Sequence, residues 1–141
     1  MIYTLGNYRE FRTKCHKVKD NDISTIIDVS VKMARLIHDD YVLIPIPNHS
    51  GKAEYTRLMA EVISNHTGLQ MCDCLTGNKR ETLYSAKING DKIDIMFKKH
   101  GRIPKKKILL IDNVIDTGRT YKTAEKALNR PCDILTISKT V

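Results

Sequence analysis

Short runs of apolar residues alternate along this chain with longer stretches in which apolar residues recur at helical spacing. The runs are rich in Ile, Leu and Val, as in parallel strands that are buried on both faces. The pattern predicts strands over residues 41–47, 69–75, 108–114 and 133–140. Pro45 lacks the N–H that a central strand donates, so we expect the regular ladder of the first strand to end about there.

Helices are predicted between these strands. Residues 55–66 and 120–129 carry apolar residues three or four positions apart, and Gly68 suits the end of the first of these helices. Another helix is predicted from about residue 21, capped by Asn21 or Asp22. Its expected inward positions are Ile23, Ile26, Ile27, Ser30, Met33, Ala34 and Ile37.

The order β-α-β, loop, β-α-β predicts an α/β fold. We expect a three-layer, doubly wound (Rossmann-like) parallel sheet with helices on both faces. Ligands bind such sheets beyond the carboxyl ends of the strands. The 141 residues suit a single domain over 1–141.

Two segments depart from this pattern. Residues 76–105 are rich in Gly and Lys, and predict a flexible hairpin or long loop with β-like pieces at 82–88 and 92–97. Residues 1–22 are predicted to form an N-terminal arm or minimal hood, because residues 1–20 are polar, basic and irregular. Its apolar residues Tyr3, Leu5, Tyr8 and Phe11 can form a short strand that packs on the domain.

Composition narrows the class of protein. No apolar run is long enough for a membrane helix and the N-terminus lacks a signal-peptide core, so a cytoplasmic protein is expected. Cys72 and Cys74 flank Asp73 in a predicted strand. A metal site without a second cysteine pair is a weak prediction, and buried reduced thiols are the better interpretation.

The net charge of +8 favours polyanionic partners, either nucleic acid or phosphorylated small molecules. Charge alone does not separate the two. Aromatic residues make up 6% of the chain and Trp is absent, which argues against a platform on which nucleic-acid bases stack.

The most informative stretch is ILLIDNVIDTGRT, residues 108–120. A buried strand leads to Asp112 and Asn113, and after two apolar residues a Thr-Gly-x-Thr loop opens a helix. Backbone N–H groups, the hydroxyls of Thr117 and Thr120 and the helix dipole would point at one phosphate. A generic strand–loop–helix with a solvated acidic end is the alternative.

This stretch resembles the ribose-phosphate motif of the type I phosphoribosyltransferases. With IPIP and its following loop and helix at 45–63 and a basic loop between, residues 41–128 look most like the small competence-type members of that family. The resemblance implies that the chain binds 5-phosphoribosyl 1-pyrophosphate (PRPP) together with Mg²⁺. It departs from the family at Asn113, where the motif has a second acid.

The resemblance also implies roles for individual residues. Asp112 and Asn113 would hold the ribose hydroxyls, with Asp112 contacting the metal through water or ligand. The 5′-phosphate would lie on Asp116, Thr117, Gly118, Arg119 and Thr120. In the hypoxanthine-guanine branch the residue matching Asp116 lies beside the purine, so Asp116 is a candidate for proton transfer. Alternatively, Asp116 only caps the turn.

A second loop follows the first predicted strand: Asn48, His49, Ser50, Gly51 and Lys52. The resemblance assigns it to pyrophosphate, and its position before a helix suits an anion. A plain β–α connection is the alternative. A nucleotide-hydrolase P-loop is excluded because Ile46 and Ala53 occupy positions that need Gly and Ser/Thr.

Family members also carry a hairpin that closes over the site and brings a cation to the pyrophosphate. Lys79, Arg80 and Lys87 are the candidates here, and a solvated charged loop is the alternative.

From the whole sequence we expect a phosphoribosyltransferase that transfers phosphoribosyl to a nitrogen nucleophile such as a nucleobase, in nucleotide metabolism, and acts as a homodimer. The catalytic candidates are Asp116 and Asp112. A non-catalytic PRPP- or nucleotide-binding protein, or a DNA-associated accessory protein, is the alternative. It is motivated by Asn113, by the charge and by the missing base-recognition tail that purine-type enzymes carry.

Overall fold

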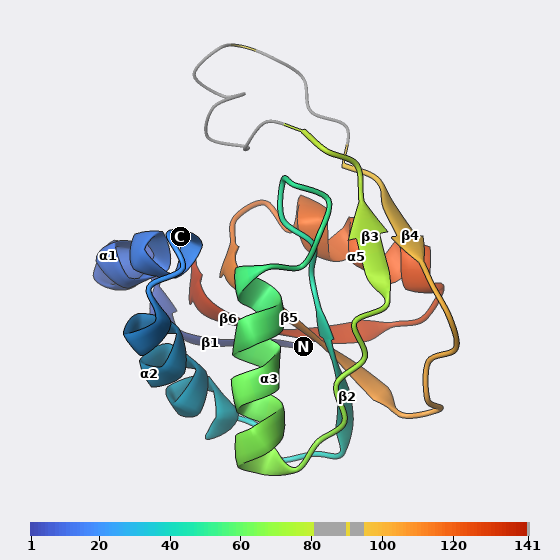
Figure 1. The fold of residues 1–141 in the computed structure, drawn as a ribbon, viewed down its shortest axis with the longest axis horizontal. Coiled ribbons are helices and arrows are strands. Elements are labelled where there is room, and N and C mark those ends of the chain that lie inside the picture. Colours follow the sequence, from blue (N-terminus) through green and yellow to red (C-terminus); the bar gives the residue numbers. More distant parts are fainter. Residues whose placement is uncertain (81–89, 91–94, 141) are drawn as a thin grey trace.

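A four-stranded parallel sheet forms the centre of the protein (Figure 1). The computed structural model describes residues 1–80, 90 and 95–140. The strands lie in the order β1-β6-β5-β2 and every neighbouring pair is parallel. Their bounds are Ile2–Asn7 (β1), Tyr41–Pro45 (β2), Lys107–Ile115 (β5) and Cys132–Lys139 (β6). The predicted parallel α/β sheet is confirmed.

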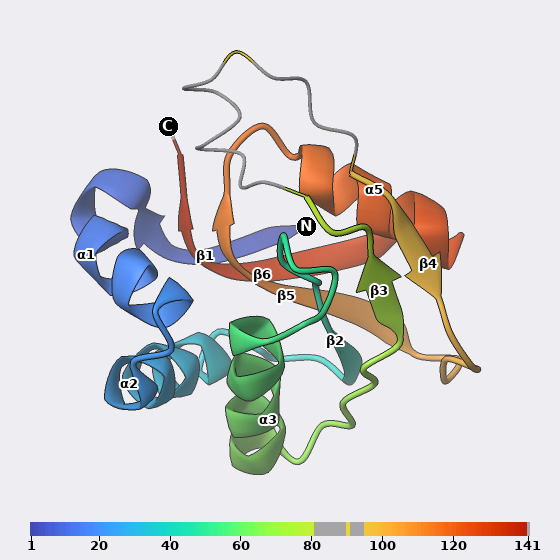
Figure 2. The same cartoon turned by 45° about the horizontal axis from the view of Figure 1, so that its top comes forward.

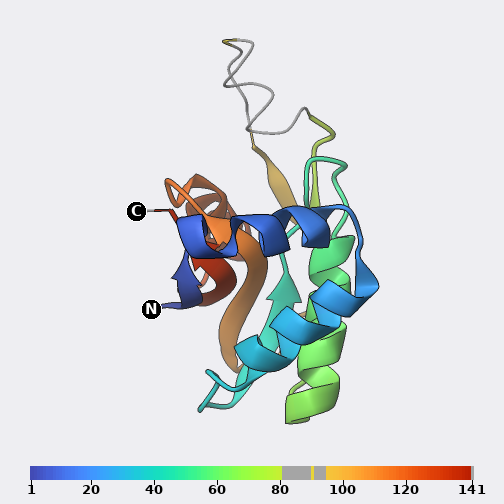
Figure 3. The ribbon, with the colours of Figure 1, turned by 90° about the vertical axis from the view of Figure 1, so that its left-hand side faces the viewer.

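Helices cover both faces of this sheet (Figures 1 and 3). One face carries α1 (Tyr8–Lys19), α2 (Ile23–Ala34) and α3 (Tyr55–Thr67). The other face carries α5 (Arg119–Leu128), together with a hairpin of β3 (Leu75–Gly77) and β4 (Phe97–Lys99), which pair in antiparallel fashion. The fold is therefore a three-layer α/β sandwich, as the sequence predicts.

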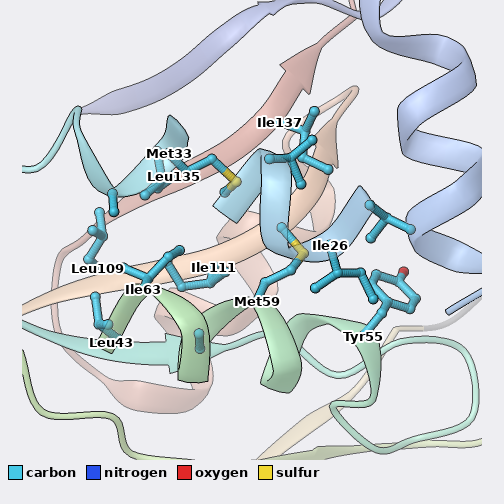
Figure 4. Packing of buried hydrophobic residues seen from close by; sticks show 14 of the residues in the cluster. Ile26, Met33, Leu43, Tyr55, Met59, Ile63, Leu109, Ile111, Leu135 and Ile137 are labelled. Atoms are coloured by element: carbon cyan, nitrogen blue, oxygen red, sulfur yellow. The ribbon is translucent and has the colours of Figure 1, made fainter. Parts of the chain in front are cut away.

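Side chains of each strand divide between two hydrophobic cores, because successive residues of a strand point to opposite faces. Leu43, Leu109 and Leu135 pack against the three helices of the first face (Figure 4). Ile44 and Leu110 belong to the other core, which α5 closes. This two-sided burial explains why the strands read as continuous apolar runs in the sequence.

The first 20 residues differ from the prediction of an irregular arm. Residues 2–7 form the edge strand β1, which confirms the short strand, but residues 8–19 form the regular helix α1. Asn7 caps α1 by accepting the N–H of Glu10. The prediction missed α1 because its sequence is strongly polar, although Tyr8, Phe11, Cys15 and Val18 face the first core at helical spacing.

The helix predicted from residue 21 is α2, and Asp22 caps it by accepting the N–H of Thr25. Two of the expected inward positions are wrong, since Ile23 and Ile27 are exposed. Val29 is buried in their place. The buried face of α2 is centred on Ile26, Val29 and Met33 and packs against α1 and α3 as well as the sheet, and Ile23 and Ile27 lie outside it.

The strand predicted over 69–75 is not a regular strand. Only an isolated bridge joins Met71 to Leu43 of β2, and Leu75 begins β3 in the separate hairpin. The antiparallel pairing of β3 with β4 agrees with the predicted hairpin. The predicted β-like piece at 82–88 and residues 92–94 of the second piece lie outside the described residues, and Phe97 at the end of the second piece begins β4.

The four cysteines are free thiols. Cys15, Cys74 and Cys132 are buried, and Cys72 is half-buried. Within the described residues, no three His, Cys, Asp or Glu side chains gather as a metal site would require. In the same part of the chain, no helix combines the length and apolar character needed to cross a membrane.

Candidate functional site: two anion loops at one edge of the sheet

Two loops with anion-binding chemistry lie at the carboxyl ends of neighbouring strands. One follows β2 and leads to α3, and the other follows β5 and leads to α5. Strands β2 and β5 pair in register, with Pro45 opposite Ile111. The fold thus brings the two predicted loops, 48–52 and 116–120, to the same edge of the sheet, which is the ligand-binding edge of such folds.

The loop after β5 is short and open to solvent. Asp116, Thr117 and Arg119 are exposed, and Gly118 has a φ of +82° that an L side chain would strain to adopt. Helix α5 begins at Arg119, and its N-cap residue Gly118 has no side chain with which to cap the first turn. Its first N–H groups and positive dipole end therefore face the loop, as a phosphate site requires.

Within this loop the Thr117 hydroxyl accepts the N–H of Arg119 at 3.3 Å. Thr120, in the first turn of α5, is half-buried. Asp116 is exposed just before the loop turns. Proton transfer by Asp116 stays a prediction.

Asp112 lies within β5, because the strand continues past it to Ile115. Its carboxylate accepts the N–H of Asn113 at 2.8 Å. Burial raises the pKa of Asp112 to about 7, while that hydrogen bond and the positive charges of Lys19 and Arg80 act in the lowering direction. Asp112 thus titrates near neutral pH, where its charge responds to a bound cation or anion.

Asn113 lies in a different environment from Asp112. Its side chain is 3% exposed, and its Nδ2 has no hydrogen-bond partner among the described residues. A buried amide N–H₂ without a partner is costly and uncommon. The two residues of the motif are therefore unequal here: Asp112 is half-buried at the site, and Asn113 is enclosed.

The loop after β2 uses its own N–H groups in this structure. The N–H groups of Asn48 and Gly51 donate to Lys52 O and Asn48 O, both at 3.0 Å. The Ser50 N–H donates to Asn48 Oδ1 at 3.0 Å, and the Ser50 hydroxyl bonds the same oxygen at 2.5 Å. Without a bound anion, these backbone N–H groups donate to oxygens of the loop itself. Binding of pyrophosphate would require them to donate to phosphate oxygens in place of these partners.

This loop is also held against the hairpin. Gly51 O accepts the N–H of Gly77 at 2.8 Å, and His49 O accepts that of Arg80 at 2.9 Å. Gly51 has a φ of +88°, and a Cβ built on it would lie 2.5 Å from Gly77 O. Glycine is required here by both its backbone angle and its close approach to β3.

Of the three candidate cations of the hairpin, Arg80 is the one that the structure bonds to the loop after β2. Its guanidinium donates to Asn48 O at 3.3 Å and to Asn78 O at 3.2 Å. Burial lowers its pKa, and it interacts electrostatically with Asp112 and Arg119. Lys79 is exposed, and Lys87 lies outside the described residues.

Two residues that the sequence interpretation did not select also belong to this edge. Lys19, the last residue of α1, acts electrostatically on Asp112. Tyr55 opens α3, and burial raises the pKa of its hydroxyl, with the negative charge of Asp112 as the next cause. Recognising α1 as a helix would have pointed to Lys19, because it lies one turn after Cys15, whose Sγ contacts Asn113 O at 4.0 Å.

The protein supplies only some of the ligands that a divalent cation would need at this edge of the sheet. Asp112 is the single carboxylate within β5 at this edge, and the described residues contain no cluster that could form a cage. Mg²⁺ commonly binds through one or two carboxylates and the phosphates of a substrate. The residues present fit a metal that arrives with a phosphorylated ligand.

Two solved structures resemble this chain, and the first of them supports the fold. A structure described as the allosteric regulatory enzyme of purine biosynthesis matches with a TM-score of 0.52 at 13% identity, over 81% of this chain and 25% of that one. This chain therefore spans a quarter of that protein. A purine phosphoribosyltransferase from Pyrococcus horikoshii Ot3 matches with a TM-score of 0.45 at 20% identity, over 79% of this chain and 68% of that one.

At these identities the likeness is one of fold. No protein-family model matches the sequence, and no curated protein matches it either. A shared fold does not determine function, which depends on the chemistry of the site.

Proposed function

We propose that this protein binds PRPP with Mg²⁺ and transfers its phosphoribosyl group to a nitrogen nucleophile, such as a nucleobase, with release of pyrophosphate. One observation carries the proposal: two anion loops lie at the carboxyl ends of the paired strands β2 and β5, and the guanidinium of Arg80 is bonded to the first of them and interacts electrostatically with Asp112. PRPP carries a phosphate at one end of a ribose and a pyrophosphate at the other, which matches two separate anion loops.

In this proposal the loop 116–120 holds the 5′-phosphate through the start of α5 and the hydroxyls of Thr117 and Thr120. Asp112 accepts hydrogen bonds from the ribose hydroxyls. The loop 48–52 and Arg80 bind the pyrophosphate and stabilise the charge that develops as it leaves. Bound Mg²⁺ would neutralise pyrophosphate oxygens. Most of the rate effect comes from positioning and charge stabilisation.

Asp116 is the candidate that exchanges a proton with the acceptor base, since it is exposed at the edge of the phosphate loop. The acceptor itself is defined here only by its chemistry, a ring or amide nitrogen that attacks the anomeric carbon. We also propose that the protein is a cytoplasmic homodimer.

A turnover assay tests transfer directly. The protein is incubated with PRPP, Mg²⁺ and each base of a panel of purines, pyrimidines and nicotinate, and released pyrophosphate is measured. Release that depends on one base supports the transferase. PRPP binding without release for any base favours the second candidate.

That second candidate is a non-catalytic PRPP- or nucleotide-binding protein on the same fold. The buried Asn113, whose Nδ2 has no partner in the described structure, favours it. With Asn113 enclosed, Asp112 alone is left to hold the ribose hydroxyls and attract the metal. Binding can survive such a loss more readily than turnover, because catalysis depends on contacts that strengthen in the transition state.

A further inference from the structure

Exposed cations gather on the face of the molecule formed by α5, β4 and the segment between β4 and β5. We call this set the basic stripe. Its members are all exposed: Lys98, Lys99, Arg102, Lys105, Lys122 and Lys126. No role in the proposed transferase reaction accounts for them.

The elements that carry the stripe pack beside one another although they come from two parts of the sequence. Lys122 and Lys126 lie one turn apart on the outer side of α5, because Ala124 and Leu128 are buried on the inner side. Strand β4, with Lys98 and Lys99, packs beside α5 (Figures 1 and 2).

Arg130, just past the end of α5, joins the remaining part of the stripe to the helix. Its guanidinium donates to Pro104 O at 3.0 Å and also to Lys106 O. The segment that carries Arg102 and Lys105 is thus fastened beside the end of α5. Together these elements gather exposed cations around a helix about 15 Å long, with Lys98 and Lys99 on opposite sides of strand β4.

These charges are not neutralised within the described structure. The neighbouring Lys106 and Lys107 pair with Asp40 and Asp39 at 3.4 and 2.6 Å, whereas no stripe residue has an ion-pair partner in the part of the chain that the structure describes. Glu125, the acid on α5, accepts the N–H of Cys132 at 2.8 Å and is half-buried. Six positive charges without acidic partners among the described residues create a positive potential that attracts a negatively charged binding partner.

We infer that the basic stripe binds the phosphate backbone of a nucleic acid. Regularly spaced phosphates complement a row of exposed Lys and Arg, and binding is driven by release of counterions. Among the described residues, the aromatic side chains of these elements, Phe97 and Tyr121, pack on the core, so they provide no surface on which bases stack. Binding is therefore independent of sequence and strongly dependent on salt.

A charge-matched pair of variants tests this surface. K98A/K122A/K126A removes three charges from the stripe. The control R9A/R12A/K17A removes three exposed charges from α1, which lies on the opposite side of the molecule (Figure 1). All six residues are exposed, so both variants should fold, and their melting temperatures check this. Fluorescence anisotropy with a labelled 20-nucleotide DNA, single- and double-stranded, measures binding between 50 and 200 mM salt.

The stripe variant is expected to bind duplex DNA about tenfold or more weakly than wild type at 100 mM salt. Its plot of log affinity against log salt should be shallower by about 2 to 3, because each phosphate contact contributes roughly 0.9 to the slope. The α1 variant should retain most of the wild-type affinity. Equal losses in both variants would overturn the inference, since net charge alone would then explain binding.

Two other probes distinguish the partner. The inference would also be overturned if polyglutamate competed as effectively as unlabelled DNA. It would equally be overturned if the protein bound phosphatidylserine vesicles and did not bind DNA. PRPP binding by calorimetry should be the same in the stripe variant and in wild type. The inference and the proposed transferase function can therefore fail independently.

Discussion

The guanidinium of Arg80 donates a hydrogen bond to the carbonyl oxygen of Asn48 at 3.3 Å. This contact joins the hairpin to the loop after β2, and places a partly buried cation beside Asp112. It is the geometric reason for assigning Arg80, rather than Lys79, to the pyrophosphate.

Substitution of Arg80 by Ala is expected to weaken PRPP binding roughly ten- to a hundredfold, because hydrogen bonds to a charged group contribute about 1.5–3 kcal/mol. The PRPP affinity of Arg80→Lys should lie between those of wild type and Arg80→Ala, since Lys keeps the charge and loses the forked geometry of the guanidinium. Calorimetric titration measures this. The exposed Lys79→Ala is the matched control, and an equal loss in that variant would contradict the assignment.

Gly51→Ala is expected to disrupt the loop after β2. The new Cβ would meet Gly77 O at 2.5 Å, in addition to the strain of a φ of +88°. Gly68→Ala is the control, because Gly68 has a φ of +77° and no atom within 4 Å of the new Cβ. Both variants should lose about 1–2 kcal/mol of stability from backbone strain.

Only Gly51→Ala should lose further stability and PRPP affinity. Thermal unfolding and titration of both variants separate the two effects. If both variants bind PRPP equally well, docking of this loop on β3 has no part in ligand binding.

Asp112 predicts a pH dependence of stability. Its pKa in the folded protein is raised to about 7, above the unfolded value near 3.8. The folded state therefore binds more protons than the unfolded state between about pH 4 and pH 7, and stability falls as pH rises through that window. Asp112→Asn should flatten this part of the profile and unfold at a higher temperature than wild type at pH 8.

The same substitution should weaken PRPP and Mg²⁺ binding above pH 7, where the wild-type carboxylate is charged. Chemical denaturation at pH 5, 6, 7 and 8 gives the first profile, and titration at the same pH values gives the second. A variant as pH-dependent as wild type in this window would exclude Asp112 as the titrating group.

Asn113→Asp is expected to destabilise the protein, although it restores the second acid of the motif. The position is 3% exposed, so the new carboxylate would be buried beside Asp112. We expect a loss of about 2–4 kcal/mol at pH 8 and a smaller loss at pH 5, where the acid can remain protonated. Thermal unfolding at both pH values checks this. A variant equally stable at both would show that the position opens to solvent.

The sequence predicted the elements with the clearest periodicity. Strand β5 and helix α5 were predicted nearly to the residue, since a continuous apolar run and an i, i+3, i+4 pattern leave few alternatives. Helix α1 was missed because most of its residues are charged, and the few apolar ones were assigned to an arm. The strand at 69–75 was wrong because a single bridge, Leu43 to Met71, replaces a full ladder.

The candidate site was predicted in the same uneven way. The two loops follow from sequence because each lies after a strand and before a helix. Burial of Asn113 and selection of Arg80 do not follow from sequence, because both depend on how the hairpin and α1 pack on the edge of the sheet. Spacing in the chain carries no information on such contacts between distant segments.

Isothermal titration of the protein with PRPP and Mg²⁺ tests the central claim most directly, with Thr117→Ala/Thr120→Ala as the control that removes the hydroxyls of the phosphate loop. The account predicts one PRPP bound per chain with a submillimolar Kd, and clearly weaker binding by the control variant. Absence of binding at millimolar PRPP, or equal binding by the control, would contradict it.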